Sequence, residues 1–257
     1  MIGFSRRTAL AGIASAPLAA SLLRLGQEAR AETGLETVSV KTPSGRTVSG
    51  LLAVPAIVPA PAVLLIHGVS GVVDFIKQFA SDFARDGFLA LALDLYDGRT
   101  ANDDTMRGYL SNEVYSDPKK ATETITTWIA WLKADQRATG KVGVIGWSFG
   151  ADWAMTASYT VPVDATVVYV ALDYPQVEYL AQLKGPVLGQ FAELDTSLSK
   201  SRVEMFEAKM KEAGKSAQVY WYPGNHYFPF PGREGYDKAL ADSAWTRTIE
   251  FLRANLR

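Results

Sequence analysis

The sequence predicts an α/β domain in which helices flank a mostly parallel central sheet. Two observations indicate this fold class. Short apolar, β-branched runs alternate with amphipathic stretches along most of the 257 residues, as strands alternate with helices. The run Lys141–Ile145 also leads through Gly146–Gly150 into a stretch of small residues from Ala151, so a buried strand turns sharply into a helix. With 48% hydrophobic residues and no internal repeat, the chain can build one full core.

The predicted domain begins with a hairpin and a central strand. Glu36–Lys41 and Thr47–Val54 alternate apolar and polar residues around a Pro-Ser-Gly turn, as half-buried strands do. Ala62–Ile66 is continuously apolar, which is typical of a parallel strand covered on both faces. It runs into the loop His67–Gly71, at the carboxyl end of a strand, where open α/β sheets bind their ligands.

The next segment predicts a helix, a strand, an insertion and a second helix. Val73–Asp86 is amphipathic, with phenylalanine at every fourth position, and Phe88–Leu93 is the next apolar strand. Residues 100–116 are polar and irregular, which favours an insertion or a small lid. Asp117 followed by Pro118 is a helix start, and apolar residues follow it at helical spacing.

The second half of the domain continues the alternation of strands and helices. Strands are predicted at Ala165–Ala171, Pro186–Phe191 and Ala217–Tyr222. Helices are predicted at Ser199–Glu212 and, at the end of the domain, at Asp237–Leu252. Because such units join parallel strands, the carboxyl ends of the strands should meet at one edge of the sheet.

The segment Gly146–Gly150 has the G-x-S-x-G sequence of a nucleophile elbow, a strand-to-helix turn that holds a serine in a strained backbone conformation. Glycine at both ends lets the strand and the helix approach closely. The turn places the Ser148 hydroxyl at a helix N-terminus, where unpaired N–H groups favour developing negative charge. We predict that Ser148 is a catalytic nucleophile; the alternative is a serine that only caps the helix.

A serine hydroxyl needs a base to take its proton during attack, and the chain has two histidines. In hydrolases with this elbow the chain order is serine, acid, histidine. His226, after the last predicted strand, fits this order, whereas His67 does not and is predicted to shape its loop. The acid must orient the imidazole. Asp195 is preferred because it follows a well-formed strand, and Asp173 and Glu193 remain alternatives.

Two backbone N–H groups are predicted to hold the oxyanion that forms during acyl transfer. They belong to Phe149, directly after the nucleophile, and to Val69, in the loop after the central strand. Trp147, Tyr227 and Phe230 fall on loops at the predicted edge of the site, where we expect them to bind substrate. Such an aromatic lining favours a neutral or apolar ester, although packing within the core and loops is the alternative for each ring.

Four motifs together resemble the dienelactone hydrolase family: Ile66–Gly71, Ala92–Tyr96, Lys141–Gly146 and Tyr222–His226. The resemblance extends over almost all of residues 35–257. It implies an α/β-hydrolase fold, a nucleophile–Asp–His triad, and cleavage of lactones and carboxylic esters. By position, the nucleophile, acid and base of the family correspond to Ser148, Asp195 and His226.

Three departures from the family pattern bear on mechanism and substrate. The typical nucleophile of the family is cysteine, and this chain has Ser148 at that position. A glutamate often follows the histidine of the oxyanion loop in the family, and this chain has Gly68 there. These two changes agree, because a serine activated by histidine needs no thiolate. Dienelactone-cleaving members have an arginine shortly after the catalytic histidine, and in this chain Phe230 stands at that position. Arg99 and Arg233 are the candidates that could replace the substrate-binding arginines of the family. An anionic dienelactone is therefore not the expected substrate.

Composition argues against several other classes of function. The absence of cysteine excludes a thiol nucleophile and disulfides. Two histidines without cysteine cannot build an ordinary zinc site, and no nucleotide-binding glycine motif occurs, so we expect no metal and no cofactor. Without residues 1–31, the 26 basic and 27 acidic residues become 22 and 26, a net charge near −4 that argues against nucleic acid. The expected partner is a small ester or lactone.

Residues 1–31 are predicted to be an export signal. The pair Arg6-Arg7 precedes the apolar stretch Thr8–Leu23, and Ala29-Arg30-Ala31 forms a small-residue cleavage site. The arginine pair indicates the twin-arginine route. The apolar stretch is shorter than the roughly 20 residues that a membrane span needs, so no stable anchor should remain after cleavage. Residues 32–257 would then form one domain in the bacterial periplasm or outside the cell.

Together these features predict an exported serine hydrolase, similar to dienelactone hydrolases, that cleaves carboxylic esters or lactones through an acyl-enzyme. Because a fold does not fix a function, the alternative is an exported domain that retains the fold only for binding.

Overall fold

The computed structural model of the protein describes residues 34–172 and 175–257. The predicted export signal, residues 1–31, and the alternative acid Asp173 lie outside these residues.

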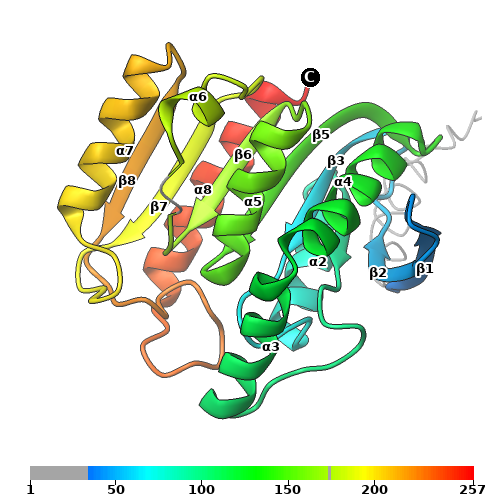
Figure 1. The fold of residues 1–257 in the computed structure, drawn as a ribbon, viewed down its shortest axis with the longest axis horizontal. Coiled ribbons are helices and arrows are strands. Elements are labelled where there is room, and N and C mark those ends of the chain that lie inside the picture. Colours follow the sequence, from blue (N-terminus) through cyan, green and yellow to red (C-terminus); the bar gives the residue numbers. More distant parts are fainter. Residues whose placement is uncertain (1–33, 173–174) are drawn as a thin grey trace, which may run out of the picture. The chain divides into compact units, whose positions relative to one another are not determined.

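An eight-stranded sheet forms the centre of the described chain, in the order β1-β2-β4-β3-β5-β6-β7-β8 (Figure 1). The first two strands pair antiparallel with each other, and β2 pairs antiparallel with β4. All later pairs, from β4–β3 to β7–β8, are parallel. The structure thus confirms the predicted α/β class with a mostly parallel sheet. The strands are β1 (Glu36–Lys41), β2 (Thr47–Ala53), β3 (Ala60–Ile66), β4 (Leu89–Leu93), β5 (Ala138–Trp147), β6 (Ala165–Tyr169), β7 (Val187–Ala192) and β8 (Ala217–Tyr222).

Helices cover both faces of this sheet and enclose two apolar layers. One layer packs under α2 and α8, and the other packs under helices that include α4, α5 and α7 (Figure 1). The described helices are α2 (Asp74–Arg85), α3 (Asp104–Ser116), α4 (Pro118–Ala134), α5 (Phe149–Thr160), α6 (Val177–Leu180), α7 (Lys200–Glu212) and α8 (Lys238–Asn255). None of the helices within the described ranges combines the length and apolar character that a membrane crossing requires.

The pleat of the central strands divides their side chains between the two layers. Along β3, Val63 and Leu65 enter the α2/α8 layer, whereas Leu64 and Ile66 enter the opposite one. All four side chains are fully buried, which explains why the strand is continuously apolar in sequence. The same alternation sends Trp147, at the end of β5, into the α2/α8 layer.

The polar insertion predicted as irregular at residues 100–116 is largely helical, as α3. Asp103 caps this helix because its side chain accepts a hydrogen bond of 2.8 Å from the Met106 N–H. Only Leu110 and Ser111 are buried along α3, so no apolar stripe marked it in the sequence. The other predicted elements are present, with ends that differ by a few residues from those expected.

Candidate active site

Ser148 forms the turn between β5 and α5. Its backbone angles are φ 52° and ψ −120°, a conformation that costs a non-glycine residue about 1–3 kcal/mol. The surrounding packing holds this strain. A Cβ atom on Gly146 would lie 1.9 Å from the Gly150 carbonyl oxygen, and a Cβ on Gly150 would lie 2.2 Å from the Ile66 carbonyl oxygen. Glycine at both ends of the motif is therefore a steric requirement for this turn.

Three of the residues predicted to be catalytic meet at the carboxyl edge of the sheet. The Ser148 hydroxyl lies 3.1 Å from Nε2 of His226, which is in the loop after β8. The other ring nitrogen of His226, Nδ1, lies 2.6 Å from Oδ2 of Asp195, which follows β7. The structure thus joins a hydroxyl, an imidazole and a carboxylate from three separate loops in one hydrogen-bonded chain.

The environment of Asp195 favours its ionised form. Its side chain is only 2% exposed, and Oδ1 accepts hydrogen bonds from the Ser197 N–H (2.8 Å) and hydroxyl (2.6 Å). Burial by itself raises the pKa of this carboxyl, but the hydrogen bonds from His226 and Ser197 together outweigh burial and hold the pKa below its ordinary value. The carboxylate is therefore charged at neutral pH and can stabilise a cation on the adjacent imidazole.

The second histidine, His67, does not contact the Ser148 hydroxyl. It is fully buried at the end of β3, and its ring nitrogens bond the Gly68 carbonyl and the Leu95 N–H. The alternative acid Glu193 is exposed and lines a different cavity, to which Asp195 also contributes.

The two backbone groups predicted to hold an oxyanion belong to residues near Ser148. Phe149 is the first residue of α5, so its N–H is among those that a helix leaves without an internal partner. Val69 lies in the loop after β3 and lines the same pocket as Ser148. Among the described residues, the Val69 N–H donates to no backbone carbonyl. Both groups are thus positioned for the predicted role, which itself stays a prediction.

A pocket of about 210 Å³ opens at the Ser148 hydroxyl. Tyr227 and Phe230, two of the three aromatic residues predicted to bind substrate, line it. Its lining residues are Gly68, Val69, Ser70, Phe75, Asp104, Arg107, Ser148, His226, Tyr227, Phe230 and Arg233.

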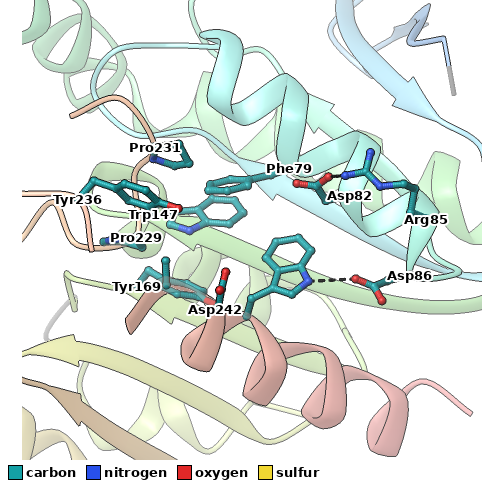
Figure 2. A pocket seen from close by; sticks show the side chains of 12 residues that line it. Phe79, Asp82, Arg85, Asp86, Trp147, Tyr169, Pro229, Pro231, Tyr236 and Asp242 are labelled. Carbon is teal, nitrogen blue, oxygen red and sulfur yellow. Dashed lines mark hydrogen bonds and ion pairs between the residues drawn. The ribbon is translucent and has the colours of Figure 1, made fainter. Parts of the chain in front are cut away.

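Trp147, the third of these aromatic residues, does not line the Ser148 pocket. Trp147 is 2% exposed and its ring stacks between Phe79 and Tyr169, with centroid distances of 5.0 and 5.6 Å. It borders a separate cavity of about 430 Å³, which Figure 2 shows with the rings of Phe79, Tyr169 and Tyr236 around it. The reason is the pleat of β5, because the side chain before Ser148 points to the α2/α8 face of the sheet.

Sequence patterns did not identify the two charged groups of α3 that reach the pocket, Asp104 and Arg107. The Arg107 guanidinium bonds the Ser70 hydroxyl (3.2 Å) and pairs with Asp104 (2.5 Å). These contacts join α3 to a loop more than thirty positions earlier in the chain. No local sequence signal marks such a contact, because the sequence of residues 100–116 predicted neither the helix α3 nor the direction in which its side chains point.

The two arginines considered as substitutes for substrate-binding groups have different surroundings. Arg99 is held by Glu113 through two hydrogen bonds of 3.0 Å and lines another cavity. Arg233 lines the Ser148 pocket, with its guanidinium 5.1 Å from the centre of the Tyr227 ring. In the described part of the chain no carboxylate forms an ion pair with Arg233.

Metal-binding side chains do not gather in the described ranges: no group of three or more histidine, aspartate or glutamate residues could hold an ion there.

The fold and the serine elbow at its carboxyl edge define an α/β hydrolase. Within this class, the chain belongs to the dienelactone hydrolase family, whose family model matches residues 48–256.

Known relatives and solved structures agree with this family. A protein of Saccharolobus solfataricus, provisionally named a carboxymethylenebutenolidase, is 27% identical over 81% of this chain and 95% of its own length. A probable 2-oxo-3-(5-oxofuran-2-ylidene)propanoate lactonase of Bradyrhizobium is 26% identical over 76% of this chain and 84% of its own. The fold matches a dienelactone hydrolase-like promiscuous phosphotriesterase from metagenomic libraries, with a TM-score of 0.77, 20% identity, and coverage of 87% and 99% of the two chains.

The steric argument about the elbow predicts the effect of Gly146→Ala. Because the added Cβ would meet the Gly150 backbone, we expect the free energy of unfolding to fall by at least about 2–3 kcal/mol, with a fall in Tm of roughly 5–10 °C. Gly108→Ala in α3 is the matched control, since its Cβ would meet no atom within 4 Å. Thermal unfolding of both variants tests this, and equal Tm values would contradict it.

Proposed function

We propose that the protein is an exported serine hydrolase that cleaves carboxylic esters or lactones through an acyl-enzyme. The observation that supports this most strongly is the continuous hydrogen-bonded chain from the Ser148 hydroxyl through His226 to Asp195. A serine becomes a nucleophile when a base lies within hydrogen-bond reach and a third group orients that base. Here both conditions hold in the resting geometry.

In the proposed reaction, the Ser148 oxygen bonds to the carbonyl carbon of the substrate while its proton passes to Nε2 of His226. The low pKa of Asp195 keeps a negative charge beside the imidazolium that results. The N–H groups of Val69 and Phe149 stabilise the oxyanion. When the tetrahedral intermediate collapses, the C–O bond to the leaving alcohol breaks and that oxygen takes the proton from His226.

The acyl-enzyme is then hydrolysed by the same groups in reverse. A water molecule gives a proton to His226 as its oxygen bonds to the acyl carbon. The bond between that carbon and the Ser148 oxygen breaks, and Ser148 recovers its proton from His226. A lactone follows the same course, except that its alcohol stays attached to the acyl group until hydrolysis releases a hydroxy acid.

The pocket supports a small acyl group with an acidic substituent more than a purely apolar one. Phe75, Phe230 and Tyr227 form apolar walls, and the sequence had indicated Phe230 and Tyr227 among them. Arg233, however, places a cation over the Tyr227 ring within the same pocket, in a half-buried position where its charge is less screened than at the surface. We therefore propose that esters with a carboxylate on the acyl side are favoured over neutral esters of equal length.

The proposal that the protein is exported rests on the sequence of residues 1–31 alone. The arginine pair, the apolar stretch and the cleavage site at Ala29–Ala31 support transport to the bacterial periplasm by the twin-arginine route.

Replacement of the nucleophile separates a hydrolase from a binding domain with the same fold. We expect Ser148→Ala to lower kcat for p-nitrophenyl acetate by about 10⁴-fold or more, because the residue that bonds to the acyl group is lost. A fluorophosphonate probe should label the native protein at Ser148 and leave the variant unlabelled. Ser116→Ala, at an exposed position at the end of α3, is the control that should retain full rate. Equal rates in native protein and Ser148→Ala would refute the proposal and favour a binding domain.

The role of Arg233 predicts a charge-dependent effect on substrate choice. We expect Arg233→Gln to lower kcat/KM for mono-p-nitrophenyl succinate about five- to tenfold, since a charge-assisted contact is lost, and to leave p-nitrophenyl acetate nearly unchanged. Arg99→Gln is the matched control, because Arg99 is paired with Glu113 away from this pocket. An equal fall in kcat/KM for both esters would show that Arg233 does not bind the carboxylate of the substrate.

Cleavage of the export signal predicts the N-terminal residue of the mature protein. We expect the protein recovered from the periplasm of a bacterial host to begin at Glu32, and the change of Arg6 and Arg7 to lysine to retain the precursor in the cytoplasm. N-terminal sequencing and fractionation measure both outcomes. Export of the double-lysine precursor at the native level would exclude the twin-arginine route.

A further inference from the structure

The hydrogen bonds of His67 define which of its ring nitrogens carries the proton. Nδ1 lies 2.7 Å from the Gly68 carbonyl oxygen, which can only accept a hydrogen bond. Nε2 lies 3.2 Å from the Leu95 N–H, which can only donate one. The ring is therefore neutral, with its proton on Nδ1. Its complete burial agrees with this, because burial lowers the pKa of His67 below its ordinary value.

The carbonyl that His67 holds belongs to the same peptide unit as the Val69 N–H. In a planar trans peptide the C=O and N–H groups point in opposite directions. A bond that draws the Gly68 carbonyl toward the buried imidazole therefore turns the Val69 N–H away from it, toward the pocket that Val69 and Ser148 both line. The Gly71 N–H also donates to this carbonyl, at 3.1 Å, which further restricts rotation of the peptide.

Aromatic packing fixes the imidazole itself. The Tyr96 ring meets it edge-on at 4.6 Å, and the Phe149 ring lies nearly parallel to it at 6.0 Å. The Tyr96 hydroxyl donates to the Val69 carbonyl at 3.3 Å, and burial raises the pKa of that hydroxyl, so it remains protonated. His67 thus contacts residues on both sides of the predicted oxyanion hole while remaining out of contact with the Ser148 hydroxyl.

We propose that His67 is a positioning residue for transition-state stabilisation: its Nδ1–H fixes the Gly68–Val69 peptide so that the Val69 N–H points at the developing oxyanion. The proposal rests on the hydrolase function proposed above. It adds that a buried, neutral histidine outside the proton-transfer chain controls the rate of acylation. Loss of one oxyanion donor typically costs about 10²–10³ in kcat, so a misdirected donor should cost a substantial part of that.

Two substitutions of similar size separate the two nitrogens of His67. In His67→Asn the side-chain amide can place a donor where Nδ1 lies, whereas in His67→Gln the amide group reaches the position of Nε2 and leaves the Gly68 carbonyl without its side-chain donor. We expect His67→Asn to retain kcat within about fivefold and His67→Gln to lose about 30- to 100-fold, with KM changed less than about threefold in both. A purely structural role would instead make activity follow Tm in both variants.

A transition-state analogue gives a second measurement. Trifluoromethyl ketones form a tetrahedral adduct with a nucleophilic serine and carry a negative oxygen in the oxyanion hole. Their affinity should fall in His67→Gln by the same factor as kcat, and remain near the native value in His67→Asn. If the glutamine variant does not fold, His67→Leu, which has no donor for the Gly68 carbonyl, gives the same measurement, with an expected loss of about 30- to 100-fold in kcat and little change in KM.

The outcomes distinguish the two proposals. Native protein that neither hydrolyses esters nor reacts with a fluorophosphonate at Ser148 would overturn the hydrolase function. Active native protein with equal kcat in His67→Gln, or an equal loss in the asparagine and glutamine variants, would overturn the role of His67 alone. An unchanged kcat in His67→Leu would do the same where the glutamine variant is unfolded.

Discussion

The close contact between the nucleophile elbow and the end of β3 is the constraint on which the site depends. A Cβ on Gly150 would lie 2.2 Å from the Ile66 carbonyl and 2.6 Å from that of His67, so the start of α5 is pressed against the loop that carries Val69. One packing contact therefore sets the distance between the nucleophile and both predicted oxyanion donors. Neither the strained Ser148 nor the loop after β3 can move without the other.

A buried polar network fixes the opposite half of the site. Gln190 of β7 donates to the Thr248 hydroxyl of α8 at 3.0 Å, and the hydroxyls of Tyr169 and Tyr222 bond to Thr248 and Gln190. These bonds join β6, β7 and β8 to one helix. Because a satisfied network in the core admits few alternative arrangements, it sets the register of β7 and β8, the two strands that lead into the loops of Asp195 and His226. The hydrogen bond between those two residues therefore requires little further ordering of the loops.

Features with a local physical signal could be predicted from the sequence, and features that arise from contacts across the chain could not. Buried strands are continuously apolar and the elbow requires two glycines, so the sheet and the position of Ser148 were evident. The helix α3 was not, because only two of its side chains are buried. The burial of Trp147 in the α2/α8 layer follows from the alternation of β5, of which it is the last residue. Arg107 reaches the pocket through Ser70, a contact that no spacing in the sequence reveals.

Glycine at position 68 has an electrostatic reason rather than a steric one. A Cβ there would lie 3.5 Å from the Trp147 carbonyl, an ordinary contact, so space alone does not exclude a side chain. The Gly68 carbonyl, however, belongs to the peptide whose N–H faces the proposed oxyanion. An acidic side chain beside that peptide would place a fixed negative charge where negative charge must develop. A serine that transfers its proton to His226 gains nothing from such a group, because it needs no separate ionisation step before attack. The proposed hydroxyl nucleophile, the neutral position 68 and the buried neutral His67 are thus parts of one electrostatic arrangement. Within the described residues, the carboxylate that bonds His226 is Asp195, on the far side of the imidazole from the Ser148 hydroxyl.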